Sequence, residues 1–365
     1  MLVSTRPPAL PDFAASRVAA LLGGARVDVC IVGGSLAGML AAYLLAREKR
    51  STMVVDAGPI GVAQGVECAH LSSVIEQPYF ALEADHGEVG ARLAAQSFHA
   101  ALDALEGIVR RERIACELER LDGYRFCAGN DASGIAEREV QAARRAGASG
   151  VEVAGSAPIE GADSGSCVRY PGQIQFHPGK LLEGLARAIG RLGGRVHWGV
   201  AVRGIESGRP SAVVTTAGHT IDAAHVVSSV APRARPAHVI GLRLPRGAAT
   251  RALYWSTEPG LRCARLRLGG PAGDILLVAG DGAPESLEAW ARNHFPRAGE
   301  VVQRFQGELP AASDVFALTG LEPASSQSLH VSTASWGSAV TRAMVAGMAI
   351  RDFVVGARQP DESAP

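Results

Sequence analysis

The sequence predicts an α/β fold with two domains. Its 365 residues exceed the size at which a single hydrophobic core usually stops growing. Hydrophobic residues make up 47% of the chain and charged residues 20%, as in ordinary globular proteins. Residues 27–56 also contain a strand, a glycine turn, a helix and a second strand in direct succession. A parallel sheet with crossover helices is therefore expected at the start of the fold.

The β-turn-α-β unit begins with an apolar, β-branched run at 27–32 and ends with a second buried strand at 51–56. Between them Leu36, Leu40 and Leu44 recur with helical spacing. This order is that of a Rossmann-like, dinucleotide-binding unit.

The turn of this unit has the spacing of the dinucleotide-binding fingerprint with one change. Gly33 permits the tight turn and Gly38 lets the helix pack closely on the strand. Ser35 stands where the second glycine is usual, and its hydroxyl can donate to a phosphate oxygen or cap the helix. Asp56 ends the second strand, where a carboxylate can bind ribose hydroxyls. The pattern predicts a dinucleotide and does not distinguish FAD from NAD.

Periodic segments continue along the chain. Residues 86–113 are predicted to be a long amphipathic helix and 137–146 a charged, exposed helical piece, which suggests a helical insertion. Further helices are expected at 178–192, stopped by Gly193 and Gly194, and at 287–293. Strands are expected at 195–205, 211–216, 219–230, 251–268 and 274–279. Residues 329–356 predict a strand, a small-residue turn and a long helix, and 357–365 are a polar tail.

Charge and cysteine usage limit the partners. Lys plus Arg and Asp plus Glu both number 36, so nucleic acid is not an expected partner. No apolar run is long enough for a membrane helix, and the N-terminal residues lack the features of a signal peptide. The six cysteines show no C-x-x-C spacing, so we expect buried free thiols, a cytoplasmic protein and no metal site.

Longer stretches carry a family resemblance, among them VDVCIVGGSLAG, YFALEADHGEVGARLAAQSFHAAL, GQIQFHPGKLLEGLARA and VSTASWGSAVTRAMVAGMAI. The chain resembles the FAD-dependent oxidoreductases of the D-amino-acid oxidase, glycine oxidase and sarcosine oxidase superfamily. It is most similar to a bacterial branch with gamma-glutamylputrescine oxidase and Rieske-fused flavoproteins, although no Rieske domain is expected here.

The resemblance implies a discontinuous FAD-binding domain of the glutathione-reductase type, formed by 1–85, 177–230 and 312–365. A substrate domain on a mixed or antiparallel sheet would comprise 86–176 and 231–311. The implied FAD-binding residues are Gly33, Gly34, Ser35, Leu36, Ala37, Gly38, Asp56, Ala57, Gly58, Val202, Ser228, Gly337, Ser338, Ala339, Val340 and Thr341.

The implied reaction passes a hydride from the carbon beside a neutral amine to the flavin, after which the imine hydrolyses. The expected partners are a small amine or amino acid and an electron acceptor or partner subunit. The predicted catalytic residues are Tyr254, Arg262, His70 and Thr341. Further substrate contacts are sought at Arg169, Tyr170 and Trp255, whereas His177 is expected to shape the start of a helix.

Two alternatives remain. GGSLAG and Gly280-Asp281 also resemble motifs of flavin-dependent monooxygenases. The family's last turn commonly reads G-x-G-M-T-x-G, but Ala339 and Ala343 replace two of its glycines. A non-catalytic FAD-binding subunit of a larger redox assembly is therefore the second alternative, and oxygen is not assigned as the electron acceptor.

Overall fold

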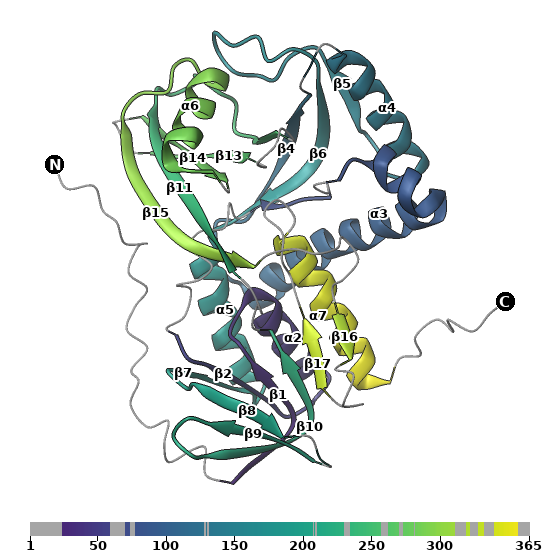
Figure 1. The fold of residues 1–365 in the computed structure, drawn as a ribbon, viewed down its shortest axis with the longest axis vertical. Coiled ribbons are helices and arrows are strands. Elements are labelled where there is room, and N and C mark those ends of the chain that lie inside the picture. Colours follow the sequence, from purple (N-terminus) through teal and green to yellow (C-terminus); the bar gives the residue numbers. More distant parts are fainter. Residues whose placement is uncertain are drawn as a thin grey trace.

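Two sheets lie at opposite ends of the fold, with helices between them (Figure 1). The computed structural model describes residues 24–58, 70–73, 77–127, 129, 131–206, 208, 210–229, 234–256, 262–269, 273–280, 282–310, 319–321, 328–331 and 339–356.

The first sheet has 8 strands and a parallel centre. Its parallel strands, in spatial order, are β17 (Ser328–Val331), β10 (Thr220–Ser228), β1 (Ala25–Val32), β2 (Thr52–Asp56) and β7 (Arg195–Trp198). Antiparallel strands complete it: β16 (Thr319–Leu321), β9 (Ser211–Thr215) and β8 (Val202–Glu206). The predicted strand–turn–helix–strand unit lies at its centre, so this Rossmann-like part of the prediction is confirmed.

Helices cover one face of this sheet: α2 (Leu36–Arg47), α5 (Pro178–Arg191) and α7 (Ala339–Val355). Helix α2 is buried along almost its whole length between the sheet and the other two helices. A Cβ at Gly347 of α7 would come within 3.2 Å of the Ala41 nitrogen, so the two helices need a small residue there. Apolar residues of β8 and β9 pack on the opposite face of the sheet.

The second sheet has 9 strands and is mixed. Antiparallel pairing predominates, and the one parallel pair among its described residues joins β12 to β4. Its spatial order is β15 (Val301–Pro310), β11 (Ala234–Leu244), β14 (Asp274–Gly280), β13 (Arg262–Arg267), β12 (Leu253–Ser256), β4 (Glu119–Phe126), β6 (Cys167–Gln175) and β3 (His70–Leu71), with β5 (Glu152–Ala154) beside β6.

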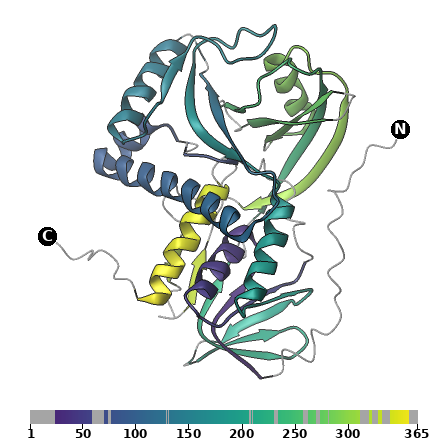
Figure 2. The ribbon, with the colours of Figure 1, turned by 180° about the vertical axis from the view of Figure 1, so that it is seen from behind.

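The two faces of the second sheet have separate cores. Helix α6 (Pro284–His294) packs on one face, around Tyr254 and Trp290. Helices α3 (Tyr79–Glu112) and α4 (Ala132–Arg145) pack on the other, around Tyr170 and Trp255. Figure 2 shows α3 extending from this sheet to the helices of the first.

The expected helical insertion is wrong in one respect, because β4, β5 and β6 follow α3 and belong to the second sheet. The short strand β3 also joins that sheet, although its residues fall within the segment assigned to the FAD-binding domain. The N-terminal arm and the polar tail lie outside the described residues. The domain boundaries themselves stay a prediction.

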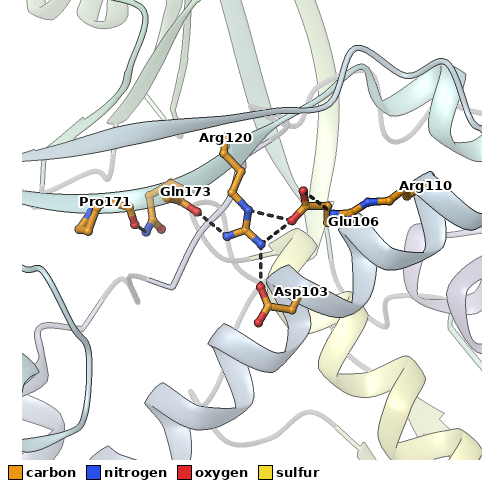
Figure 3. Close-up of polar contacts among 7 residues, drawn as sticks. Asp103, Glu106, Arg110, Arg120, Pro171 and Gln173 are labelled. Atoms are coloured by element: carbon orange, nitrogen blue, oxygen red, sulfur yellow. Dashed lines mark hydrogen bonds and ion pairs between the residues drawn. The ribbon is translucent and has the colours of Figure 1, made fainter.

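Arg120 of β4 fastens α3 to the second sheet (Figure 3). Its guanidinium donates to Glu106 Oε2 at 2.6 and 2.8 Å, to Asp103 Oδ1 at 2.6 Å and to the Gly172 carbonyl at 3.0 Å. Gly172 has a positive φ of 69°, which favours glycine, and it lies where the β4–β6 register shifts. The pairing with Arg120 holds the pKa of Glu106 below its ordinary value.

The cysteines divide into two groups. Cys30, Cys116 and Cys167 are buried and free, and Cys127 is half-buried and free, as expected. Cys263 is buried and disulfide-bonded, so the expectation of a free thiol is wrong there. Sequence spacing cannot show a pair that only the fold brings together. Among the described residues, no helix is long and apolar enough to cross a membrane.

Glu139 of α4 is the centre of a buried polar network. It is 1% exposed, accepts from the Tyr170 hydroxyl at 2.6 Å and pairs with Arg125 at 3.2 Å. Burial raises the pKa of the Tyr170 phenol well above its ordinary value, so Tyr170 serves as a neutral donor. The network joins α4 to β4 and β6.

We predict that Glu139→Ala lowers the free energy of unfolding by about 3–5 kcal/mol, because it leaves the Arg125 cation buried without its partner. Urea unfolding measures the change. The matched control is Glu83→Ala, which breaks the more exposed pair with Arg145 and should cost less than about 1 kcal/mol. Equal costs for the two variants would contradict the prediction.

Candidate functional site

The turn between β1 and α2 has the geometry of a phosphate-binding site. Gly33 has a φ of 106°, which favours glycine. A Cβ at Gly38 would lie 2.4 Å from the Gly33 carbonyl oxygen and 2.7 Å from Ser229 Oγ. Gly33 is therefore favoured by its backbone conformation, and Gly38 is required by the close approach of helix and strand.

Ser35 caps helix α2, which was one of its two expected roles. Its Oγ accepts from the Gly38 N–H at 3.2 Å. The N–H groups of Leu36 and Ala37 in the first turn have no partner among the described residues. Free donors at a helix N-terminus attract a phosphate group.

Asp56 lies beside this turn at the end of β2. Its Oδ2 accepts from the Gly34 N–H at 2.6 Å, and its Oδ1 accepts from the Gly58 N–H at 2.7 Å. Each oxygen keeps a further lone pair, so the carboxylate is oriented and can still accept from a hydroxyl group. Ala57 lies between these two contacts along the chain. The free N–H groups at the start of α2 and the space left by the glycines fit the phosphates of FAD, and the Asp56 carboxylate fits a ribose hydroxyl group.

The sequence prediction overlooked two residues at this site. Ser229 donates through Oγ to the Gly33 carbonyl at 2.6 Å, whereas its predicted neighbour Ser228 pairs with Val32 in the sheet. Trp198 ends β7, and its ring lies against Gly34. The predicted residue Val202 begins β8 shortly after it.

The start of α7 is fastened to the second sheet through Thr341. Its Oγ1 accepts from the Ser72 N–H at 2.9 Å and donates to the Ser72 carbonyl at 2.8 Å, although the residues are 269 positions apart. Gln173 of β6 continues the chain of contacts, because its Oε1 accepts from Ser72 Oγ and from the Ser73 N–H, each at 2.7 Å. We call Thr341, Ser72, Ser73 and Gln173 the interdomain clamp.

The clamp lies at the predicted flavin end of the site. Thr341 and Val340 are buried, and Ala339 begins the helix. The preceding predicted residues Gly337 and Ser338 lie outside the described residues. Because the Thr341 hydroxyl makes two buried hydrogen bonds, it positions α7.

Three polar atoms without hydrogen-bond partners lie on the α3 side of the second sheet: His70 Nε2, Gln175 Oε1 and Arg265 Nε. His70 and Gln175 are paired across β3 and β6, so their side chains are on one face. Burial, and then the charge of Arg265, lower the pKa of His70 to about 3, so its ring is neutral at neutral pH. We call these three residues the orphan cluster.

The other predicted substrate residues lie elsewhere. Tyr254 is fully buried on the α6 side, where its hydroxyl donates to the Thr250 carbonyl at 2.7 Å. Arg262 donates to Ser286 Oγ of α6 at 3.1 Å. These placements give no support to a catalytic role for either residue.

The remaining candidates also have structural partners. Arg169 pairs with Asp122 and Glu152. Trp255 packs on Tyr170, with ring centroids 5.9 Å apart. His177 caps α5 by accepting from the Lys180 N–H at 3.4 Å, which agrees with its expected role at the start of a helix.

Comparisons with known proteins agree with this geometry. The family described as "DAO: FAD dependent oxidoreductase" matches residues 28–353. Glycine oxidase from Geobacillus kaustophilus has a similar structure, with a TM-score of 0.74 and 18% identity over 92% of this chain and 96% of that one. L-proline dehydrogenase from P. horikoshii gives a TM-score of 0.73 and 12% identity over 92% and 95%.

A curated relative is similar over a shorter stretch. It is the Bacillus subtilis (strain 168) protein named "Putative Rieske 2Fe-2S iron-sulfur protein YhfW", which is 27% identical over 221 residues. The match covers 60% of this chain and 42% of that protein, so less than half of the relative's length is represented.

We predict that Gly38→Ala greatly reduces FAD retention and lowers the free energy of unfolding by about 1–3 kcal/mol, because the new methyl group overlaps the Gly33 carbonyl. Flavin absorbance per protein and urea unfolding measure the two effects. Gly107→Ala is the control: it lies inside α3 with open space around its Cα and should stabilise the protein by about 0.5–1 kcal/mol. Undiminished FAD content in Gly38→Ala would contradict the prediction.

We also predict that Thr341→Val destabilises the protein by about 1–3 kcal/mol, since it leaves buried backbone groups of Ser72 without partners. The unfolding midpoint and the visible absorption of the flavin are measured together. Thr341→Ser keeps the hydroxyl and should retain most of the stability. If Thr341→Val and Thr341→Ser behave alike, the clamp does not depend on these hydrogen bonds.

Proposed function

Because the chain belongs to the family of FAD dependent oxidoreductases, we propose that it oxidises the C–N bond of an amino acid. The proposal is supported by the FAD-binding geometry at β1, α2 and β2. The names of the similar structures, glycine oxidase and L-proline dehydrogenase, are consistent with such a substrate. The observation that carries it is the orphan cluster, His70, Gln175 and Arg265.

Arg265 provides a cation for the carboxylate. Burial, and then the charge of Arg267, lower the pKa of Arg265 to about 10, so the guanidinium remains charged at neutral pH. The acid that interacts with it, Glu117, forms an ion pair with Lys180. Arg265 is half-buried and its Nε has no hydrogen-bond partner among the described residues, so a substrate carboxylate would supply the acceptor that this nitrogen lacks.

Gln175 and His70 provide acceptors for the amine. The Gln175 amide donates through Nε2 to Glu119 at 3.2 Å, which orients its Oε1 without satisfying it. The neutral His70 ring can accept at Nε2 and adds no charge to compete with the amine or with the carboxylate. One cation and two acceptors on the same face of the second sheet complement the two ends of an amino acid.

The chain's own residues bind and orient the substrate in this proposal. When bound, FAD supplies the two-electron oxidising chemistry. Arg265 fixes the carboxylate, and Gln175 and His70 hold the nitrogen through its N–H groups. The clamp residues Thr341 and Gln173 hold the start of α7 in a fixed position relative to the second sheet, beside the proposed substrate site.

The proposal is tested by anaerobic reduction of the bound flavin with amino acids and with the corresponding decarboxylated amines. We expect amino acids to bleach the flavin and the amines lacking a carboxylate to do so at least about 10-fold less efficiently. Admission of oxygen afterwards shows whether oxygen is the electron acceptor. A yellow protein that no amino compound reduces would overturn the proposal and favour the non-catalytic alternative, whereas NADPH-driven reduction would favour the monooxygenase.

We predict that Arg265→Gln lowers the second-order rate constant for flavin reduction by amino acids about 10- to 100-fold, since a charged hydrogen bond contributes about 1.5–3 kcal/mol. FAD content should stay unchanged, because the residue lies on the second sheet. Arg267→Gln is the control on the same strand, where Arg267 donates to Gln303 at 3.1 Å. Equal effects of the two substitutions would argue against a carboxylate at Arg265.

A further inference from the structure

Trp198 lies at the adenosine end of the FAD-binding geometry. It ends β7 and is paired with Asp56 at the end of β2. A Cβ placed on Gly34 would lie 2.3 Å from Trp198 Cζ3 and 2.5 Å from Cη2. The outer edge of the indole therefore rests on the glycine whose N–H orients the Asp56 carboxylate.

The indole is only partly buried. It packs against the core of the first sheet and its helices and keeps part of its surface exposed. The chain then turns around the end of β2, where the Val200 N–H donates to the Asp56 carbonyl at 2.8 Å. Trp198 is thus fixed beside Asp56, on the side of β2 that faces away from β1.

With the phosphates of a dinucleotide at the start of α2 and its ribose at Asp56, the base would lie next to the ribose, and Trp198 stands beside Asp56. Aromatic side chains stack on nucleic-acid bases with an energy of about 1–3 kcal/mol per base. We propose that the Trp198 indole is the stacking platform for the adenine of FAD. This proposal depends on the FAD-binding geometry and is independent of the substrate.

The experiment compares FAD and ADP binding to the flavin-free protein in three forms: unchanged, Trp198→Leu and Trp198→Phe. Leucine keeps apolar bulk against Gly34 and removes the π-face, whereas phenylalanine keeps a smaller ring. Calorimetric titration should show binding of both ligands weakened about 10-fold or more in Trp198→Leu and only a few-fold in Trp198→Phe. ADP contains the adenosine half alone, so a change seen with ADP belongs to this end of FAD.

Fluorescence gives a second readout. ADP should quench the tryptophan emission of the unchanged protein, and this quenching should be lost in Trp198→Phe. Trp290→Phe, in α6 and buried against the second sheet, is the control and should leave the quenching intact. Equal affinity of Trp198→Leu and Trp198→Phe for ADP would overturn the proposal, as would tighter binding by either variant, because the indole would then fill space that the nucleotide needs.

Discussion

The paired hydrogen bonds between Thr341 and the main chain of Ser72 are the interaction on which the arrangement of the site depends. They join α7, which packs on the first sheet, to the residue that directly follows β3, the edge strand of the second sheet. Gln173 extends the connection into β6 through Ser72 and Ser73. Because all four residues are buried, water does not compete for these bonds, and the start of α7 is held in one position relative to the sheet.

The pairing of β3 with β6 explains why the hydrogen-bonded side chains of the clamp lie next to the unpartnered atoms of His70 and Gln175. Ser72 follows His70 by two residues on one side of the β3–β6 ladder, and Gln175 follows Gln173 by two on the other. Side chains two residues apart share a face, so the clamp and the orphan cluster occupy neighbouring rows of one surface. Gln173 is saturated by protein partners and Gln175 keeps its oxygen open. The first row maintains the structure, and the second is where we propose that the substrate binds.

The sequence predicted the part of the fold whose physical determinants are local. The positive φ of Gly33, the cap by Ser35 and the carboxylate of Asp56 all act within one β-turn-α-β unit. Strands β4 and β6 were missed because Arg120, Pro171 and Gly172 interrupt the alternation of apolar and polar residues that marks a strand. The acids that neutralise Arg120 come from α3 rather than from either strand. Trp198 gave no signal either, since only the pairing of β7 with β2 brings it to Gly34.

The substrate side of the site shows how far a family resemblance reaches. It directed attention to strands β12 and β13, and the alternation of side chains along these strands then separates the candidates by the face on which they lie. Tyr254 and Arg262 face α6, whereas Trp255 and Arg265, each an odd number of residues away, face α3. Arg265 and Arg267, two residues apart in RCARLR, suggest a solvent-exposed face when read locally. Strand β13 is an inner strand of a covered sheet, so the polar groups of its arginines need partners. Arg262 donates to Ser286 and Arg267 to Gln303. A substrate carboxylate is the partner that we propose for Arg265.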